Sequence, residues 1–258
     1  TNLAASKALV IDTTAPTITS VTSTTDDGTY NADDTINITV NFSEAVTLSG
    51  GNLVVTLETG ENDRTVTITS ISGSNTASGT YTVQSGDTSS DLTVSSIALS
   101  GGSLSDAAGN AMSSFAIATN LAASKALVID TTPATVTNVT SSTTNGTYNA
   151  DDAISIQVVF SEVMTVSGVP QLTLETGSSD AVVNYASGNG SNTLTFTYTV
   201  ASGQTSSDLD YASTSALALN GGSILDPAGN ASTLTLASPG ATGSLGANEA
   251  LVVDNTAP

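Results

Sequence analysis

A long repeat constrains this chain more than any other feature. Residues 1–12 (TNLAASKALVID) recur letter for letter at residues 119–130. Asp12, Asp130 and Asp254 open three related segments, DTTAP, DTTPA and DNTAP, in steps of 118 and 124 residues. Steps of this size suit one independently folding domain each, and a fixed period indicates a tandem array. What has to be explained is one repeat together with the junction to the next.

The period predicts two whole repeats and two partial ones. Residues 13–130 and 131–254 form the whole repeats. Residues 1–12 correspond to the C-terminal strand of a preceding repeat, and residues 255–258 to the start of a following one. We therefore expect a longer parent protein, in which neighbouring repeats of the same chain are the main partners.

The charge balance excludes several kinds of partner. The 258 residues include 23 acidic and 3 basic side chains and no histidine, which gives a formal net charge of −20. Binding to nucleic acid or to an anionic membrane needs clustered Lys and Arg, so neither is expected. Residues 131–254 contain no basic residue at all. Their carboxylates must face water, accept hydrogen bonds or bind a cation from outside.

Catalysis and membrane insertion also lack support in the composition. With no Cys and no His, the chain has no thiol nucleophile, no imidazole base and no soft metal ligand. A paired-carboxylate glycosidase would need a cleft with stacking aromatics, but the chain has no Trp, 6 Tyr and 4 Phe. No apolar run approaches the roughly 18 residues that cross a bilayer. We expect a protein that is not an enzyme and does not insert into a membrane.

The period of the apolar residues predicts an all-β fold. Ile36, Ile38, Val40 and Phe42 alternate with polar residues, as they do in a strand with one buried face. The inward face Leu194, Phe196, Tyr198, Val200 of the second repeat matches Ala77, Gly79, Tyr81, Val83 of the first. Because Gly79 stands where the second repeat has Phe196, we expect a thinner and less stable first core.

Other strand candidates in the first repeat are separated by turn sequences such as SGGN, QSGD and DAAGN, and no stretch combines helical spacing with a proper cap. They are Thr17–Ser23, Leu53–Glu58, Thr65–Ser70, Ser96–Ser100 and Phe115–Ala118 with Ala126–Ile129. About seven short antiparallel strands per repeat predict two tandem immunoglobulin-like β-sandwich domains. The Cys and Trp residues of antibody domains are absent.

The segments VIDTTAPTITSV, GTYNADDTINITVNFSEAVTLSG, LETG and ALSGGSLSDAAGN, with their counterparts in the second repeat, resemble the Ig-like or cadherin-like repeats of large bacterial surface proteins and adhesins. The resemblance covers essentially the whole chain. It implies an extracellular location, on a bacterial cell surface or secreted, and a spacer that calcium often stiffens. It does not fix the adhesion target.

Running seven strands up and down a sandwich assigns the loops to two ends. The end where a repeat begins receives its linker Asp, the FSE loop and the DAAGN or DPAGN loop. The far end receives NADD, the SGDTSSD or SGQTSSD loop and the outgoing Asp. The predicted ligands at the central joint are Asp33, Asp34, Asp87, Asp91, Asp130, Glu162, Asp226 and Asn230. Those at the entry of the first repeat are Asp12, Glu44, Asp106 and Asn110.

Carboxylates gathered in this way, with no Lys or Arg expected nearby, would repel one another unless a cation separates them. Calcium (Ca2+) takes 6 to 8 oxygen ligands, and both carboxylates and Asn side chains serve. Cadherin ectodomains resemble this plan by role, although DTTAP is not their linker sequence.

Each motif also has a structural explanation. DAAGN and DPAGN can be tight turns with a capping Asp, and Glu44 and Glu162 can be solvated strand ends. The metal role of Asp87 is weakened because its counterpart is Gln204, whereas Asp91 matches Asp208. Tyr30 and Tyr148 are expected to plug the sandwich end.

Three functions remain open on the sequence. The leading one is a calcium-rigidified extender module of an adhesin-type protein. The alternative is a glycan-binding accessory β-sandwich of an exported polysaccharide-active enzyme, which predicts an exposed aromatic platform, with Tyr185 or Tyr211 as candidates. The third is self-association through edge strands.

Overall fold

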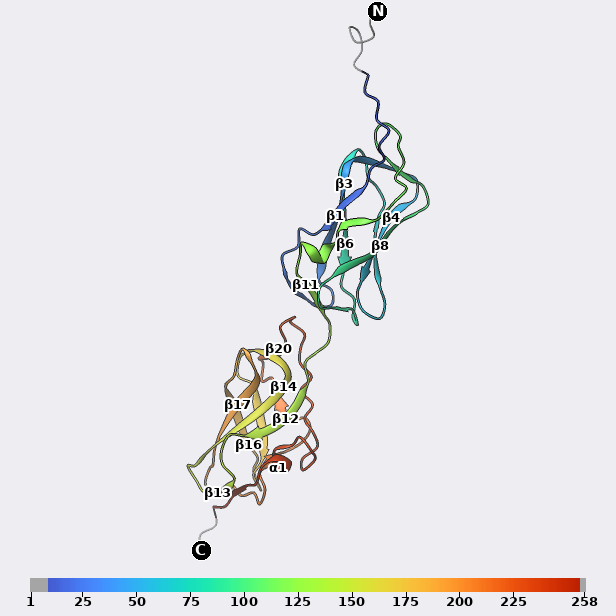
Figure 1. Ribbon diagram of the computed structural model, residues 1–258. Coiled ribbons are helices and arrows are strands. Elements are labelled where there is room, and N and C mark those ends of the chain that lie inside the picture. Colours follow the sequence, from blue (N-terminus) through green and yellow to red (C-terminus); the bar gives the residue numbers. More distant parts are fainter. Residues whose placement is uncertain (1–8, 256–258) are drawn as a thin grey trace, which may run out of the picture. The chain divides into compact units, whose positions relative to one another are not determined.

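The computed structural model describes residues 9–255, and the chain divides into two units between Thr131 and Thr132. Each unit is described by itself (Figure 1). Both are immunoglobulin-like β-sandwiches, which confirms the predicted fold class. Most of the segment assigned to a preceding repeat, residues 1–8, and the end of the chain, residues 256–258, lie outside the described residues.

The first unit consists of two packed sheets. One has the order β10-β1-β3-β6, with β9 paired to the far half of β3, and the other has the order β5-β4-β8. A short third sheet, β2-β11-β7, closes one end. The strands are β1 (Ile18–Thr22), β2 (Gly28–Tyr30), β3 (Thr35–Ser49), β4 (Asn52–Glu58), β5 (Arg64–Ile68), β6 (Ser74–Thr82), β7 (Thr88–Ser89), β8 (Thr93–Ser100), β9 (Ser103–Ser105), β10 (Ile117–Thr119) and β11 (Leu127–Asp130).

The core of the first unit follows the alternation read from the sequence. Ile36, Ile38 and Val40 are fully buried on β3, and Phe42 is 5% exposed. From the facing sheet, Leu53, Val55 and Leu57 of β4 contribute fully buried side chains. Burial of these apolar faces is the main force that holds the two sheets together.

The second unit repeats the plan with one continuous sheet. The order β12-β14-β17-β16-β15-β18 carries both layers, and β13 pairs with β21 at the end. The strands are β12 (Val136–Ser141), β13 (Gly146–Tyr148), β14 (Ala153–Ser167), β15 (Gln171–Glu175), β16 (Ala181–Ser187), β17 (Ser191–Thr199), β18 (Asp210–Tyr211), β19 (Leu217–Ala218), β20 (Ser223–Leu225) and β21 (Leu251–Val253).

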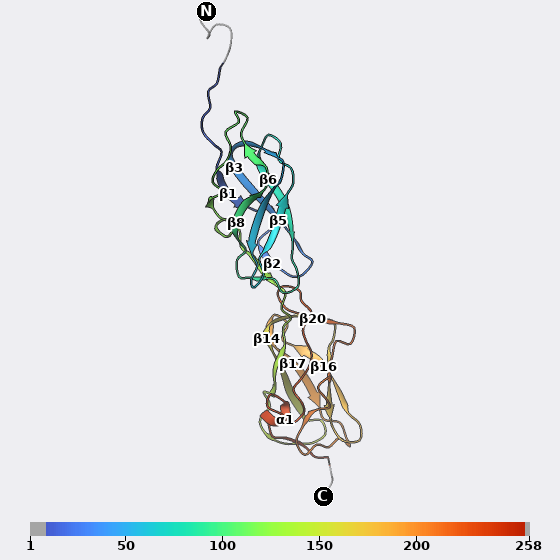
Figure 2. The same cartoon turned by 90° about the vertical axis from the view of Figure 1, so that its right-hand side faces the viewer.

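The two units differ where their sheets meet at one lateral edge. In the second unit β16 pairs with β17 through Tyr185↔Phe196, and the two strands run side by side in Figure 2. In the first unit Gly79 stands where Phe196 does. A Cβ on Gly79 would lie 2.4 Å from a Cγ of Val66, so the glycine permits a close approach of β6 to β5. The sequence predicted a thinner first core. In the structure, β5 and β6 pack closely at the place where the second unit has the ring of Phe196.

Two short helices were not predicted. One is the 3-10 turn η2 (Leu121–Ala123), capped by Asn120, and the other is the single turn α1 (Leu245–Asn248). The Oγ of Ser244 accepts a hydrogen bond from the backbone N–H of Ala247 and caps α1. One turn is too short to show an apolar period, which is why sequence patterns miss it. Among the described residues, no helix is long and apolar enough to span a bilayer.

Candidate metal centre and its surroundings

The loop after β9 is shaped by an Asp and an Asn four residues apart. Asn110 donates its backbone N–H to Oδ1 of Asp106 (2.8 Å) and its side-chain Nδ2 to Oδ2 of the same residue (2.8 Å). Gly109, with φ of +92°, supplies the left-handed residue that the turn needs. Asp106 is 6% exposed. The DAAGN motif is thus a tight turn that holds one carboxylate in a fixed position.

The same loop holds the incoming chain. Nδ2 of Asn110 also donates to the backbone carbonyl of Asp12 (3.2 Å). Oδ1 of Asp12 accepts the N–H of Thr14 (3.0 Å), which forms an Asx turn at the start of DTTAP. The position of Asp12 therefore depends on one amide side chain and one local turn.

Glu44 reaches the same place from a bend in β3. The pairing of β3 with β6 shifts register between Asn41 and Val46, and Glu44 lies within this irregular stretch. Beside it, the backbone N–H of Ser43 donates to the carbonyl of Thr17 (2.9 Å), and Oγ of Ser43 accepts from the backbone N–H of Thr17 (3.0 Å). The FSE motif therefore ties the bend to the incoming segment and turns Glu44 toward it.

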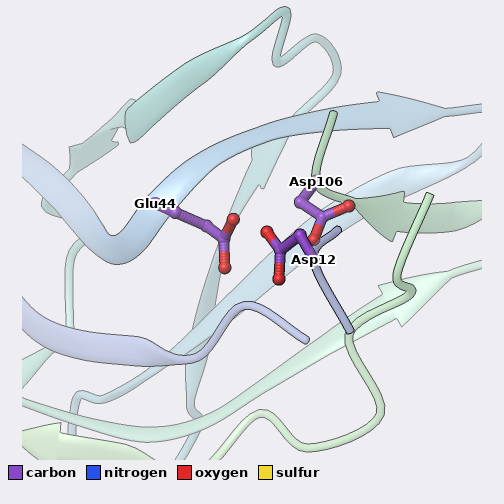
Figure 3. Close-up of side chains that lie close together, drawn as sticks. All are labelled: Asp12, Glu44 and Asp106. Carbon is purple, nitrogen blue, oxygen red and sulfur yellow. The ribbon is translucent and has the colours of Figure 1, made fainter. Parts of the chain in front are cut away.

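Three carboxylates meet at this end of the first unit. One carboxylate oxygen from each of Asp12, Glu44 and Asp106 lies within 4.8 Å of the others, and Figure 3 shows the groups facing one another. Asp12 and Glu44 border a hollow of about 370 Å³ that is also lined by Val10, Ala45, Ala107 and Ala108. The hollow is open to solvent, so an ion has access to it.

The cluster is electrostatically unbalanced. Desolvation raises the pKa of Glu44, and repulsion from Asp106 and then Asp12 raises it further. The hydrogen bonds from Asn110 lower the pKa of Asp106, so that carboxylate stays ionised. No Lys or Arg makes a described ion pair here, because the described pairs are Arg64–Asp87 and Lys125–Asp27. A bound cation would remove this repulsion.

The donor set fits calcium. Two ligand oxygens on opposite sides of one calcium ion, each at about 2.4 Å, lie about 4.8 Å apart. The three oxygens of this cluster lie within 4.8 Å of one another, so one ion can contact all of them. All three groups are hard oxygen donors. The remaining ligands of a 6- to 8-coordinate ion would come from second carboxylate oxygens, backbone carbonyls and water.

The corresponding residues of the second unit are built in the same way. Asn230 donates its N–H to Oδ1 of Asp226 (2.8 Å) and its Nδ2 to Oδ2 (2.9 Å), and Asp226 is 2% exposed. Glu162 lies in β14 within the stretch where its pairing with β17 shifts register. The N–H of Ser161 donates to the carbonyl of Thr135 (2.9 Å), as Ser43 does to Thr17.

The far end of the first unit does not gather the predicted ligands. NADD is a tight turn in which Asp33 has a φ of +74° and Oδ2 of Asp34 accepts the N–H of Asn31 (3.0 Å). Asp91 lies exposed between β7 and β8. Among residues 9–255, no group of three clustered acidic side chains includes Asp33, Asp34, Asp87 or Asp91. The role of these four acids as metal ligands at the joint stays a prediction.

Asp87 has a structural role instead. It is 1% exposed, and Oδ1 accepts a hydrogen bond from Nε of Arg64 (2.7 Å). Oδ2 accepts from the hydroxyl of Tyr81 (2.7 Å) and the N–H of Gln84 (2.9 Å). The assumption that no basic residue lies near these acids was wrong for Arg64. A buried carboxylate with these three donors is already neutralised and satisfied.

The sequence held a signal for this pair. Gln204 replaces Asp87 and Ala181 replaces Arg64 at the same repeat positions, so both charges disappear together. Oε1 of Gln204 accepts from the hydroxyl of Tyr198 (2.8 Å) and the N–H of Ala201 (2.9 Å). Reading the two substitutions as one coupled change would have identified the ion pair.

Each unit also anchors a residue just beyond its last strand, which sequence reasoning missed. Oγ1 of Thr131 donates to the carbonyl of Asp87 (3.0 Å) and accepts from the N–H of Gly86 (3.0 Å). In the second unit, Nδ2 of Asn255 donates to the carbonyls of Ala201 (3.0 Å) and Gln204 (2.8 Å). In each unit, two hydrogen bonds thus hold the outgoing chain to the equivalent turn, which contains Asp87 in the first unit and Gln204 in the second.

The tyrosines provide no exposed aromatic platform. Tyr211 is fully buried, and its hydroxyl donates to the carbonyl of Ala237 (2.6 Å). Tyr185 is half-buried and packs edge-on against Phe196, with ring centroids 6.1 Å apart. Tyr30 and Tyr148 are partly buried against the cores of their units, and the hydroxyl of Tyr30 donates to the carbonyl of Asp26 (2.6 Å).

No protein-family model and no curated protein matches the chain. Among solved structures it is similar to the crystal structure of chicken CNTN1 FN1-FN3 domains, at 11% identity and a TM-score of 0.25. The match covers 83% of this chain and 64% of that one, so the chain spans less than two thirds of that structure. A TM-score this low carries no argument, and the fold class rests on the sheet topology.

Proposed function

We propose that this chain is a calcium-rigidified structural extender module of a large adhesin-type protein, on a bacterial cell surface or secreted. The observation that carries the proposal is the cluster of Asp12, Glu44 and Asp106, in which the incoming linker, a bend in β3 and the loop after β9 present unneutralised oxygen donors to one another. A linker residue that shares an ion with the body of a domain cannot swing freely from it.

The repeat extends this argument along the array. In the sequence, Asp130 precedes Glu162 and Asp226 as Asp12 precedes Glu44 and Asp106. By this equivalence we expect one calcium site wherever a linker Asp enters a repeat. The segment Leu9–Ile11 has the same letters as Leu127–Ile129 of β11, so we expect it to be the closing strand of a preceding repeat.

The anchored outgoing residue supports the same role. Thr131 is held to the turn at Gly86 and Asp87 by two hydrogen bonds, so the chain leaves the first unit in a fixed direction. A metal on the incoming side would then complete a linker that is held at both ends. This combination suits a spacer that must transmit a fixed orientation.

The test compares the protein in calcium and in EDTA. We expect EDTA to lower the melting temperature and to shorten the maximum dimension in solution scattering, because repelling carboxylates would loosen the joints. Magnesium serves as the control, since its smaller octahedral site fits this donor set less well. Unchanged melting and unchanged scattering would remove the proposal.

The glycan-binding alternative has no supporting observation in the aromatic residues, because Tyr211 is buried and Tyr185 packs against Phe196. Self-association through edge strands is tested by sedimentation at high concentration, where a strictly monomeric protein would contradict it.

A further inference from the structure

The second unit contains an open groove where the first unit is filled. The groove has a volume of about 470 Å³ and is lined by residues 180–184 of β16 and its approach, residues 197–199 of β17, and the turn residues Ala201 and Gln204. The ten lining residues all have counterparts 117 positions earlier, from Asp63 to Asp87. One repeat therefore serves as the internal control for the other.

An arginine occupies the equivalent position of the first unit. The side chain of Arg64 starts at the position of Ala181 and reaches Asp87 with an Nε to Oδ1 distance of 2.7 Å. Ala181 lines the groove and ends at its Cβ, so no long side chain from this strand position fills the groove of the second unit. The fold itself shows that a guanidinium on its three-carbon stem fits this location.

The charges have been rearranged in a way that suits a reversible occupant. A buried carboxylate like that of Asp87 would be strongly destabilising whenever its cation was absent. In the second unit the neutral Gln204 lines the groove, and its Oε1 accepts hydrogen bonds from the hydroxyl of Tyr198 and the N–H of Ala201. The empty groove therefore leaves no unpaired buried charge.

A negative charge remains at the rim. Asp180 lines the groove and is exposed, so its carboxylate is hydrated when the groove is empty. Its counterpart Asp63 accepts a hydrogen bond from Oγ of Ser95 (3.2 Å), but the residue corresponding to Ser95 is Ala212, which has no hydroxyl. Among the residues that the structure describes, none donates a hydrogen bond to the carboxylate of Asp180.

The strand edges beside the groove are also available. The N–H of Tyr185 donates toward β15 (2.8 Å to the carbonyl of Pro170), so by alternation Val182 and Asn184 direct their backbone groups the other way. The pairing of β16 with β17 is limited to Tyr185↔Phe196 and Ser187↔Thr195. Beyond these two pairs, at Val182, the edge of β16 that faces the groove is therefore open to an added segment.

From these observations we infer that the groove of the second unit binds the arginine side chain of an extended partner segment, with Asp180 as the charge partner. The net charge of −20 disfavours a second copy of this chain and favours a basic partner. Arginine is preferred over lysine because its planar fork can bind a carboxylate with two parallel hydrogen bonds. This inference is independent of the calcium proposal, because none of the groove residues belongs to the carboxylate cluster.

The test is a titration of the isotope-labelled whole protein, followed by NMR, with the peptide acetyl-Thr-Val-Arg-Val-Thr-amide. The matched control peptide has citrulline in place of arginine, which keeps the shape and removes the charge. We expect saturable shifts confined to residues 180–184 and 197–204, with at least about tenfold weaker binding of the citrulline peptide. The same loss is expected for Asp180→Asn with the arginine peptide.

A filled-groove variant separates this site from general attraction to an acidic surface. Ala181→Arg combined with Gln204→Asp installs the pair that the first unit already accommodates, so the variant should fold, and it should no longer bind the peptide. Equal binding of the citrulline peptide, persistent binding to the filled variant, shifts spread over both units, or no saturable shift at all would each overturn the inference.

Discussion

The two units differ in how their two sheets pack together at one lateral edge of the β-sandwich. The first unit has a glycine at position 79, a close approach of β5 and β6, and a buried ion pair between Arg64 and Asp87. The second has Phe196 in the core, a paired β16 and β17, and a neutral Gln204. The same sandwich frame can therefore be closed at this edge by close strand packing with a buried ion pair, or by an aromatic ring with a neutral amide, provided that every buried polar group keeps a partner.

The largest expected effect comes from removing the ring that distinguishes the second core. Phe196→Ala should destabilise the second unit by about 3–5 kcal/mol, because removal of this fully buried ring leaves a cavity in the core. Amide hydrogen exchange of the intact protein resolves the two units and measures the loss.

The matched variant in the first unit, Gly79→Ala, should cost about 1–3 kcal/mol of stability through overpacking against Val66. A neutral Gly79→Ala would show that the close approach of β6 to β5 is not required.

The next largest loss of stability is expected when the ion pair of the first unit is broken. Arg64→Ala should cost about 2–3 kcal/mol, less than a fully buried pair, because the Arg64 side chain is 36% exposed while Asp87 is 1% exposed. Adding Asp87→Gln reproduces the second unit and should recover most of the loss in a double-mutant cycle followed by urea unfolding. Additive losses in the double variant would contradict the claim that the two repeat differences are coupled.

The calcium cluster should be visible as a difference between conditions. At ten times its dissociation constant, calcium should stabilise the first unit by about 1.4 kcal/mol. Glu44→Gln should remove this gain, and in EDTA it should raise the melting temperature because it relieves repulsion from Asp106 and Asp12. Glu58→Gln is the surface control, since Glu58 lies at the end of β4, outside the cluster. A lower melting temperature of Glu44→Gln in EDTA would show that the repulsion is not significant.

The smallest effect is a pH dependence with opposite signs in the two conditions. The pKa of Glu44 is raised in the folded state, so the stability that it contributes is present at low pH and is lost as pH rises through its folded pKa. The pKa of Asp106 is lowered, so its contribution is lost only as pH falls through that lower value. In EDTA, mild acidification should therefore stabilise the first unit slightly, whereas in calcium it should weaken binding. Thermal unfolding across this range, with Glu44→Gln as the insensitive control, checks both signs.

Much of the fold could be predicted from the sequence because its signals are local. The alternation of Ile36, Ile38 and Val40 identified the long strand β3, and the repeated turns marked most strand ends. The clustering of Asp12, Glu44 and Asp106 followed from chain topology alone. The partners of charged side chains from different sheets were not predicted. The contact of Arg64 with Asp87 joins residues far apart in the sequence, so it leaves no local pattern. Short capped turns such as α1 were missed for lack of length.

The most direct test of the calcium account is a calorimetric calcium titration of the wild-type protein beside Glu44→Gln and Asp106→Asn. We expect saturable binding by the wild type, loss of one class of site in each variant, and retention of the site expected at the equivalent residues of the second repeat. Identical titrations for all three proteins, or no binding by the wild type at millimolar calcium, would contradict it.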